Sequence, residues 1–596
     1  GSGLLRRPVS MLSFSLNRYF FGTEPYSHKV INLVIHLLTG ICLFLLSRRL
    51  MLSYRKYHKP HLPDAYIAWL PLVVSGLWLI HPLNLTSVLY IVQRMTSLSS
   101  LFTVCGLLFY VIGRQRMLGG KPGLPLILGG LVVCGGLAVL SKENGALLPL
   151  YMLVVEIALF RFREHSGNLD RSVIAFFTFI VALPAALFLV YLAFNPAFFL
   201  GGYNIRDFTL TERLLTEARV LVFYLKLTIL PSITDLGLYH DDITLSRSLL
   251  DPPSTLYSLI ALAGLMLGAF LSLKKYPLVG LGILWFFAGH MLESTLLPLE
   301  IVHEHRNYLA DYGIILAVSS ALAEAKFHRL SPVIRKAAPL MFFIMFASTT
   351  WLRAGQWSDN ISHAVYEARH HPNSFRSAYA AGRIHARLAL HYHSDSEKKS
   401  YDFLEQASKL SKSDIMPSIV MVKLANLLGS PVKETWFDNI YDSLAFYPIN
   451  AGDLNALHEL SSCMASKCEI PNEKMEKIFR LALENPSLDY SPRMHAQLVT
   501  IYAIHSINNR GDFHNGLKLF TRAVELDEKE PQRWINLIHL LAEMQKYDEA
   551  EQKLALFKAT DTHGGNPGDY KKLQEKIDKQ RKEHASMTSG KDSEKG

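Results

Sequence analysis

The sequence has few charged residues, and this shortage restricts the kind of protein it encodes. Among its 596 residues, Asp, Glu, Lys and Arg account for 19% and hydrophobic residues for 50%, which argues against an ordinary soluble enzyme and a disordered chain. Five cysteines are too few for a disulfide-stabilised scaffold. The sequence also lacks a phosphate-binding loop, a dinucleotide-binding fingerprint and a nucleophile elbow, so nothing in it supports an ATP-driven activity.

Long apolar runs are present up to about residue 354 and absent beyond it. We expect ten of them to be membrane-crossing helices, although several are shorter than the roughly 20 residues that a full crossing requires. The expected spans are 28–46, 66–80, 98–113, 124–140, 146–160, 173–194, 256–273, 278–291, 312–323 and 339–352. The pattern predicts an all-α fold that begins with a polytopic membrane bundle.

The net charge of +10 is distributed unevenly between alternate loops. One set of loops carries Arg48, Arg49, Arg55, Lys56, Lys59, Arg114, Arg116, Lys121, Arg161, Arg163, Arg171, Lys274, Lys275, Lys326, Arg329, Arg335 and Lys336. The positive-inside rule places this set in the cytoplasm, so we read the charge as a membrane-orientation signal and predict no nucleic-acid partner. The loop 195–254 and both chain ends then lie outside. That arrangement predicts one further membrane helix before residue 1, and eleven in total.

Two amphipathic segments accompany the expected spans. Residues 210–230 place Leu214, Ala218, Leu221 and Leu225 at helical spacing within the long outer loop. Residues 4–21 mix arginines with aromatic and aliphatic side chains. We expect both segments to be helices that lie flat on the membrane surface.

The last third of the chain has a 34-residue period. Residues of similar type recur at this interval: Phe513 and Tyr547, Gly516 and Ala550, and Phe520 and Leu554. This period is typical of tetratricopeptide (TPR) repeats, which stack helix pairs into a solenoid, and weaker units fall at 364–372, 401–410 and 479–486. We therefore expect a membrane domain at 1–354, a TPR-like domain at 355–560 and a disordered polar tail at 561–596.

Polar residues gather in the loops predicted to lie outside. Arg94, Lys142 and Arg306 are suited to bind a phosphate at the bilayer surface. The candidate general bases are Glu293, Glu300 and Glu304, and the candidate substrate-binding residues are Gln93, Glu143, His303, His305 and Tyr308. Ionisable groups at membrane depth usually face a functional cavity. The alternative is that these residues are interfacial side chains and ion pairs without a catalytic role.

Four further groups have simpler interpretations. His303, Glu304 and His305 lack a nearby residue that would complete a metal site, so we expect neither a metal ion nor another cofactor. His240, Asp241 and Asp242 could meet a sugar or a metal, but a solvated turn is the favoured interpretation. His28, Asn32 and His36 form a stripe that predicts hydrogen bonds between helices. Cys463 and Cys468 could form a disulfide.

The order of the motifs resembles that of the transmembrane-and-TPR-containing O-mannosyltransferase group and its bacterial relatives, which are GT-C-fold glycosyltransferases. The motifs are Arg7-Pro8-Val9, Phe21-Gly22, His28…Asn32…His36, His81-Pro82, Gln93-Arg94-Met95, Ser141-Lys142-Glu143 and Glu304-His305-Arg306-Asn307-Tyr308-Leu309. The resemblance covers nearly the whole chain and implies transfer of a sugar from a polyprenyl-phosphate carrier to a hydroxyl group. The acidic residue that the family keeps after its first helix has no match here, since Glu24 does not fit the usual acidic pair.

From this resemblance we expect an inverting, single-displacement transfer on the lumenal or periplasmic side. A carboxylate would take the acceptor proton, and Arg306 with Lys142 or Arg94 would stabilise the leaving lipid phosphate. The expected partners are membrane lipids, the lipid-linked sugar and an acceptor protein, such as a pilin-like surface protein, on the TPR-like domain. The expected location is a bacterial inner membrane with a periplasmic repeat domain; the alternative is the endoplasmic reticulum.

Two other functions remain open at this point. A polysaccharide polymerase or ligase would use similar outer loops and arginines to join lipid-linked glycans. A non-catalytic membrane scaffold would use its TPR-like repeats to assemble a secretion or pilus machine. The repeats favour a protein acceptor, because solenoids usually bind polypeptide.

Overall fold

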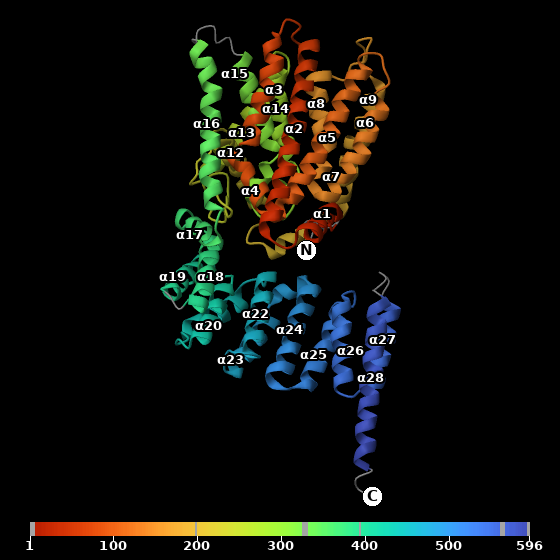
Figure 1. Ribbon diagram of the computed structural model, residues 1–596, viewed down its shortest axis with the longest axis vertical. Coiled ribbons are helices and arrows are strands. Elements are labelled where there is room, and N and C mark those ends of the chain that lie inside the picture. Colours follow the sequence, from red (N-terminus) through yellow and green to blue (C-terminus); the bar gives the residue numbers. More distant parts are fainter. Residues whose placement is uncertain (1–5, 197–199, 325–331, 393–394, 561–566, 593–596) are drawn as a thin grey trace. The chain divides into compact units, whose positions relative to one another are not determined.

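The computed structural model describes residues 6–196, 200–324, 332–392, 395–560 and 567–592 (Figure 1). Regular structure in these ranges is helical, with one isolated bridge between Arg163 and Leu169. The predicted all-α fold class is confirmed. The chain divides into two compact units, Gly1–His371 and Pro372–Gly596, which we call unit 1 and unit 2. The division lies beyond the predicted domain boundary at 354, because one more helix packs into unit 1.

Unit 1 is a bundle of apolar helices (Figure 1). Its main helices are α2 (Pro25–Tyr57), α3 (Asp64–Leu79), α4 (Leu85–Leu89), α5 (Arg94–Met117), α6 (Leu124–Gly130), α7 (Gly136–Ser141), α8 (Leu148–Val155), α9 (Arg171–Phe177), α10 (Leu183–Phe194), α13 (Ser254–Ser272), α14 (Pro277–His290), α15 (Ala310–Glu324) and α16 (Pro332–Gln356). π-helical turns at Leu131–Gly135, Glu156–Phe160 and Thr178–Ala182 extend or join some of them. All ten predicted spans fall on these segments.

Not every predicted span is long enough to cross a membrane alone. Within the described residues, six helices pass by length and composition, and α3 with the following Pro82–Leu89 forms a seventh candidate bent by 47°. Helix α14 is apolar but has only 14 residues. The structure therefore supports a membrane protein with six to seven clear spans by this criterion, fewer than the ten expected.

The basic loops gather at one end of unit 1, which we call the basic end. Arg49 of α2 donates to Gln115 of α5, and Arg161 donates to the carbonyl of Leu273 at the end of α13. These contacts join loops that the charge pattern had placed on one side. Lys326 and Arg329, assigned to the same side, lie outside the described residues. The opposite end, where the loops around residues 81–94, 141–147 and 291–309 meet, we call the site end.

A buried ion pair stabilises the basic end. Arg114 of α5 donates through Nε and Nη2 to the two carboxylate oxygens of Glu156, each at 2.9 Å, and Nη1 lies 3.3 Å from Asp170 Oδ2. The backbone N–H of Phe162 also donates to Glu156, at 2.8 Å. The Arg114 and Glu156 side chains are fully buried. We call these four residues the inner cluster.

The two amphipathic helices differ from each other. Helix α1 (Pro8–Phe21) buries Ser10 and Asn17 and exposes Leu16 and Phe20, so its apolar side faces outward, as expected for a helix on a membrane surface. Helix α12 (Leu210–Ile229) instead buries charged residues of its polar face.

Leu214 of α12 is exposed, whereas Arg213, Glu217, Val220 and Tyr224 are buried. The C-terminal half of α12, which includes Val220 and Tyr224, packs in one cluster with residues of α14 and α15. The predicted helix is confirmed, but its charged face lies inside unit 1 and not towards solvent. Its position flat on the membrane surface stays a prediction.

Helices α14 and α15 approach each other closely at two glycines. A Cβ atom on Gly282 would lie 2.2 Å from the carbonyl oxygen of Gly313, and one on Gly313 would lie 2.4 Å from that of Gly282. Any side chain at either position would push the helices apart. The loop between these helices, residues 291–309, carries seven of the candidate site residues.

Unit 2 is a TPR-like solenoid of short helices (Figure 1). They are α18 (Phe375–Tyr392), α19 (Ser396–Leu410), α20 (Met416–Leu428), α21 (Glu434–Phe446), α22 (Ala451–Met464), α23 (Asn472–Leu483), α24 (Pro492–Arg510), α25 (Phe513–Leu526), α26 (Pro531–Glu543), α27 (Tyr547–Thr560) and α28 (Pro567–Asp592). The matched residues Gly516 and Ala550, and Phe520 and Leu554, are buried on α25 and α27. The predicted period therefore corresponds to repeated packing.

Two expectations for this half of the chain need correction. The weak unit at 364–372 lies on α17 (Asn360–His370), which belongs to unit 1. The segment predicted as a disordered tail forms α28, because Leu573 and Ile577 pack with α26 and α27 and are buried. Residues 561–566 and 593–596 of that segment lie outside the described residues.

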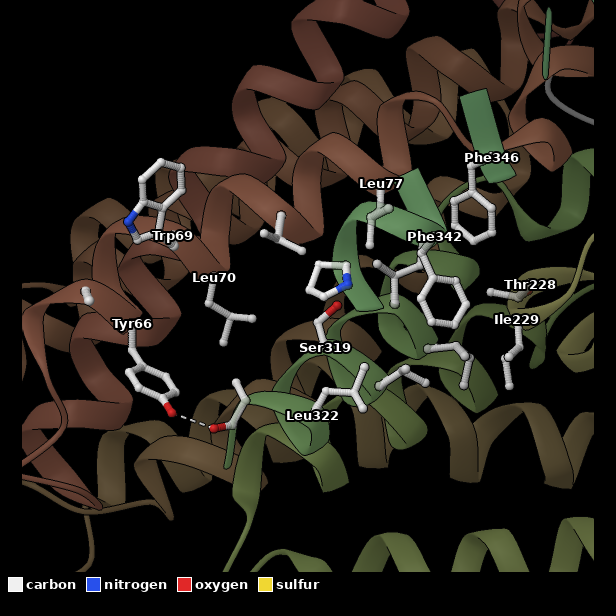
Figure 2. A pocket seen from close by; sticks show the side chains of 17 residues that line it. Tyr66, Trp69, Leu70, Leu77, Thr228, Ile229, Ser319, Leu322, Phe342 and Phe346 are labelled. Carbon is white, nitrogen blue, oxygen red and sulfur yellow. Dashed lines mark hydrogen bonds between the residues drawn. The ribbon is translucent and has the colours of Figure 1, made fainter. Parts of the chain in front are cut away.

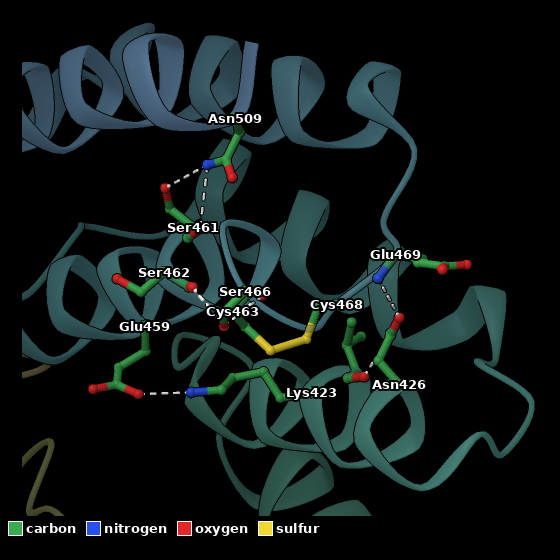
Figure 3. The surroundings of a disulfide bond; sticks show 11 residues. Lys423, Asn426, Glu459, Ser461, Ser462, Cys463, Ser466, Cys468, Glu469 and Asn509 are labelled. Carbon is green, nitrogen blue, oxygen red and sulfur yellow. Dashed lines mark hydrogen bonds and ion pairs between the residues drawn. A yellow bond between two sulfur atoms is a disulfide. The ribbon is translucent and has the colours of Figure 1, made fainter. Parts of the chain in front are cut away.

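The cysteines of unit 2 form a disulfide, Cys463–Cys468 (Figure 3). It closes the turn after α22, where the backbone N–H of Cys468 donates to the carbonyl of Cys463 at 2.9 Å. Nearby, Lys423 Nζ lies 2.6 Å from Glu459 Oε2, and this pair is partly exposed. The disulfide left open by the sequence is present.

Candidate functional site

Five charged side chains meet at the site end, and we call them the charge cluster: Lys142, Arg213, Glu217, Glu293 and Arg306. Lys142 Nζ lies 3.0 Å from Glu293 Oε1. Arg306 lies between two carboxylates, with Nε 3.7 Å from Glu293 Oε2 and Nη1 3.7 Å from Glu217 Oε1. Arg213 Nη2 lies 2.9 Å from Glu217 Oε1. The structure therefore brings together three residues singled out from the sequence and adds two from α12.

The arginines of the cluster also fix the loop that follows α14. Arg213 donates to the carbonyl of Glu293 at 2.6 Å. Arg306 donates to the carbonyls of Glu300 and Ile301, at 2.5 and 2.7 Å. Each guanidinium thus holds backbone and carboxylate together, a use for which its several donors are suited.

The two carboxylates of the cluster differ in acidity. Burial raises the pKa of Glu217 to about 7, because the charges of Arg306 and Arg213 only partly offset the loss of hydration. Burial also acts against ionisation of Glu293, but the charges of Lys142 and Arg306 outweigh it and hold this pKa well below its usual range. Glu293 is a weak base at neutral pH, so it suits positioning of the two cations better than proton transfer.

Some carboxylate oxygens of the charge cluster lack a hydrogen-bond partner within it. Among the described residues, Oε2 of Glu217 and Oε2 of Glu293 are buried without a hydrogen-bond partner, and Oε1 of Glu217 has ion-pair contacts with Arg213 and Arg306 only. A cavity of about 20 Å³ lies beside Arg306, with space for a single water-sized group. Polar side chains in its wall are Thr96, Ser99, Ser100, Thr103, Asn144 and His305. Buried oxygens rarely lack partners, so this region has unused capacity for hydrogen bonding.

Glu304 belongs to a different group of contacts. Its Oε2 lies 2.5 Å from Arg353 Nη2 of α16, and its Oε1 accepts the N–H of Gly237 at 2.9 Å. Burial opposes ionisation of Glu304, but Arg353 outweighs it and lowers the pKa. Because Glu304 is buried and holds Arg353, it ties the outer loop to α16.

Glu300 and His303 form the more accessible acid–base pair. His303 Nε2 lies 2.5 Å from Glu300 Oε2, and their side chains remain 28% and 34% exposed. The His305 ring stacks on His303 at 4.9 Å between centroids. Burial, aided by the charge of Lys142, lowers the pKa of His305 well below its usual value, which keeps that ring neutral. Of the three predicted carboxylates, Glu300 best meets the need of a general base for access to a substrate.

Arg94 does not join the charge cluster. It is fully buried and donates to Asn32 and Asn17, each at 2.7 Å, and to the carbonyls of Ser13 and His28. Its guanidinium thereby ties α1 to α2 and α5. The expectation that Arg94 shares a phosphate site with Lys142 and Arg306 is not supported by these contacts.

The remaining predicted substrate residues have structural partners. Glu143 lies 2.8 Å from Arg7 Nη2. Gln93 accepts a hydrogen bond from Thr96 at 2.8 Å. The Tyr308 hydroxyl is buried, 2.8 Å from His36 Nδ1, which confirms a hydrogen bond between helices from the polar stripe on α2.

Sequence reasoning missed Arg213, Glu217, Arg353 and Asp311. Arg213 and Glu217 are four residues apart and share a helical face with Val220 and Tyr224, a pattern that could have indicated a buried charged face. Asp311 is fully buried in the first turn of α15, and neither of its carboxylate oxygens has a hydrogen-bond partner among the described residues. Its position directly before an apolar run was the available signal.

An apolar groove of about 390 Å³ runs along unit 1 (Figure 2). Its wall comes from α3, α12, α15 and α16, and includes Trp69, Leu70, Leu77, Ile229, Leu322 and Phe342. It extends from Tyr66, near the basic end, to Thr228 and Phe346. The Phe346 ring meets the His81 ring edge to face, with centroids 4.4 Å apart, and Arg353 lies about two turns further along α16. The groove therefore leads towards the site end.

The predicted solvated turn at 240–242 is wrong for His240, which is only 6% exposed. Helix α17 covers this part of the outer loop: the N–H of Leu238 donates to Glu367 Oε2 at 2.9 Å.

Comparison with known proteins identifies no family. No protein-family model and no curated protein matches the chain. Among solved structures, the crystal structure of the yeast Tom70 aligns with 89% of this chain and 100% of that chain at 13% identity. Its TM-score of 0.28 is too low to support any inference about this protein.

Proposed function

We propose that this protein is a membrane glycosyltransferase that moves a sugar from a polyprenyl-phosphate carrier to a protein hydroxyl group. The observation that carries the proposal is the charge cluster. Lys142 and Arg306 are buried cations held by carboxylates at one end of an apolar bundle. Buried ionisable groups at such a depth are expensive and usually serve a function. A leaving phosphate carried by a lipid is the anion that such a position suits.

The apolar groove supports a lipid-linked donor. Its wall is mainly aliphatic and aromatic, and it lies between helices that can face the bilayer. An isoprenoid chain in this groove would place its polar end towards His81 and Arg353. We infer that the donor enters sideways from the membrane and does not pass through water.

The proposed reaction is a single displacement with inversion. The acceptor oxygen forms a bond to C1 of the sugar as the bond from C1 to the phosphate oxygen breaks. Glu300, oriented by His303, takes the acceptor proton. Lys142 and Arg306 stabilise the negative charge that develops on the phosphate. Glu293 holds both cations in place.

We assign acceptor binding to unit 2. TPR-like solenoids present extended surfaces that bind polypeptide. The charge pattern of the loops favours the side opposite the cytoplasm as the place of reaction, and we propose the periplasmic side of a bacterial inner membrane.

The test is intact-mass spectrometry of surface and secreted proteins from host cells. The cells would carry wild-type protein, Arg306→Ala, or the control Arg247→Ala, whose side chain is 73% exposed on the loop 231–253. We expect one or more proteins to lose a sugar-sized mass in Arg306→Ala only, with equal membrane levels of all three proteins. Unchanged protein masses, together with altered lengths of lipid-linked glycans, would instead favour a polysaccharide polymerase. No change in either would favour a scaffold.

A further inference from the structure

Two histidines and an aspartate converge where α17 meets the loop 231–253. His240 and Asp242 come from that loop, and His371 follows the last residue of α17. One potential ligand atom from each of the three lies within 4.8 Å of the others. The separation of 129 residues between Asp242 and His371 explains why the local motif at 240–242 did not indicate the third residue. We propose that His240, Asp242 and His371 bind a divalent transition-metal cation, with Zn²⁺ as the best match.

The two imidazoles have free capacity for a ligand. His240 and His371 are each only 6% exposed, and their rings lie 5.6 Å apart at 83°. The Nε2 atoms of both are buried without a hydrogen-bond partner among the described residues. His240 Nε2 is 3.5 Å from Glu304 Oε1, a long contact for a hydrogen bond. Two buried imidazole nitrogens without partners are unusual unless a ligand satisfies them.

The ligand set fits zinc better than magnesium or calcium. Zn²⁺ binds imidazole nitrogen and carboxylate oxygen at about 2.0–2.2 Å, usually with four ligands, whereas the harder cations prefer oxygen alone. Asp242 is partly exposed, so a water molecule can supply the fourth ligand. At present His371 Nδ1 lies 3.0 Å from Asp242 Oδ2, and small side-chain rotations would direct these groups to a shared ion.

The surroundings are organised to hold the three ligands. The N–H groups of Gly237 and Leu238 bind the carboxylates of Glu304 and Glu367, at 2.9 Å each. A Cβ atom on Gly237 would lie 2.9 Å from both Glu367 Oε2 and His371 Nε2, so only glycine lets the loop approach α17 this closely. The carboxylates add negative charge that favours a cation. The ion would fasten α17 to the outer loop.

The test begins with metal analysis of full-length protein purified in detergent without a polyhistidine tag. We expect about one zinc per chain by elemental mass spectrometry in the wild type, and less than a fifth of that in His371→Gln and Asp242→Asn. The matched control is His370→Gln, which removes an exposed histidine from the preceding position and should keep its zinc. A wild type without bound metal, or equal zinc in all four proteins, would overturn the proposal.

A second measurement separates metal loss from misfolding. Wild-type protein is treated with EDTA, dialysed, and titrated with ZnCl₂ while its apparent Tm is recorded. Binding to the folded state alone must raise the Tm with zinc concentration. We expect a rise of several degrees in the wild type and in His370→Gln, and none in Asp242→Asn, which keeps its fold. An absence of any zinc-dependent shift in the wild type would contradict the site.

Discussion

The inner cluster and the charge cluster contain the same chemistry at opposite ends of unit 1, but they differ in saturation. In the inner cluster, Arg114 meets both oxygens of Glu156 at 2.9 Å, and a backbone N–H adds a further bond. In the charge cluster, Arg306 lies 3.7 Å from each of its two carboxylates. Glu217 Oε2 and Glu293 Oε2 have no hydrogen-bond partner among the described residues, and Glu217 Oε1 has ion-pair contacts only.

The difference indicates how buried charge is used in this bundle. A saturated pair has no capacity for a ligand, so the inner cluster is best explained as a structural fastening of α5 to the loop after η5 (Glu156–Phe160). An unsaturated group retains donors and acceptors that a substrate can engage. Burial alone therefore does not identify a functional charge, whereas burial with incomplete pairing does.

The largest effect is expected from Arg114→Gln. It leaves Glu156 buried without its partner, which costs about 3–5 kcal/mol of folding stability. The check is the apparent Tm and the monodisperse fraction in detergent, with the exposed neighbour variant Arg116→Gln as control. Equal Tm values for the two variants would mean that the inner cluster contributes no more to folding stability than an exposed arginine does.

A second variant, Arg306→Lys, keeps the positive charge but loses the planar guanidinium, whose paired N–H donors form a fork. If the proposed transfer depends on that fork, its rate should fall about 10²–10³-fold, the loss typical of one missing oxyanion donor. The apparent Tm should fall less than in Arg114→Gln. The measurement is the initial rate of sugar transfer in membranes that contain equal amounts of each protein. Undiminished transfer would remove Arg306 from the proposed phosphate site.

The raised pKa of Glu217 predicts a pH-dependent contribution to stability. Its pKa is about 7 in the folded protein against 4.5 as the ordinary value, so the folded state binds the extra proton. Stability from this group is therefore present below about pH 4.5 and is lost as pH rises through 7.

The comparison variant is Glu217→Gln, which imitates the protonated form. Relative to the wild type, it should be more stable by about 2–3 kcal/mol at pH 8 and about equal at pH 4.5. Denaturant unfolding across this pH range gives the difference curve. A flat curve would show that Glu217 is already ionised at low pH and that the charge cluster is better paired than the distances indicate.

The smallest effect is expected from an exposed ion pair in unit 2. Lys423 and Glu459 lie 2.6 Å apart, but Glu459 is 66% exposed (Figure 3). Their coupling in a double-mutant cycle with Lys423→Ala and Glu459→Ala should be below about 1 kcal/mol. A larger coupling would weaken the argument that burial and saturation, rather than short distance, set the strength of these pairs.

The regular parts of the fold could be predicted from the sequence. Apolar runs located the helices of the bundle, and the 34-residue period located the packed faces of α25 and α27. Helix α17 was misplaced because a change in composition near residue 355 marks the end of apolar sequence, not the end of the unit. Helix α28 was missed because two buried side chains, Leu573 and Ile577, are a weak signal in a polar segment.

The candidate site could be predicted only in part. Lys142, Glu293 and Arg306 were found together because polar residues in apolar surroundings are conspicuous. The sequence could not show that Arg94 meets Asn32 or that Glu304 meets Arg353, since these partners are fixed by packing between distant helices. The face of α12 was misjudged for the same reason: helical spacing does not tell whether a charged side contacts water or other buried charges.

The close approach of Gly282 and Gly313 means that a substitution far from the polar residues can shift the loop 291–309. The loop that bears Glu293, Glu300 and Arg306 leaves and re-enters the bundle through this helix pair, whose separation is limited by bare backbone. A change of a single methyl group there would alter the spacing of the loop's two ends without replacing any polar side chain. If the proposed transfer takes place, selection for a new donor or acceptor can therefore act on buried glycines of the bundle, and mutational screens confined to the polar residues would miss it.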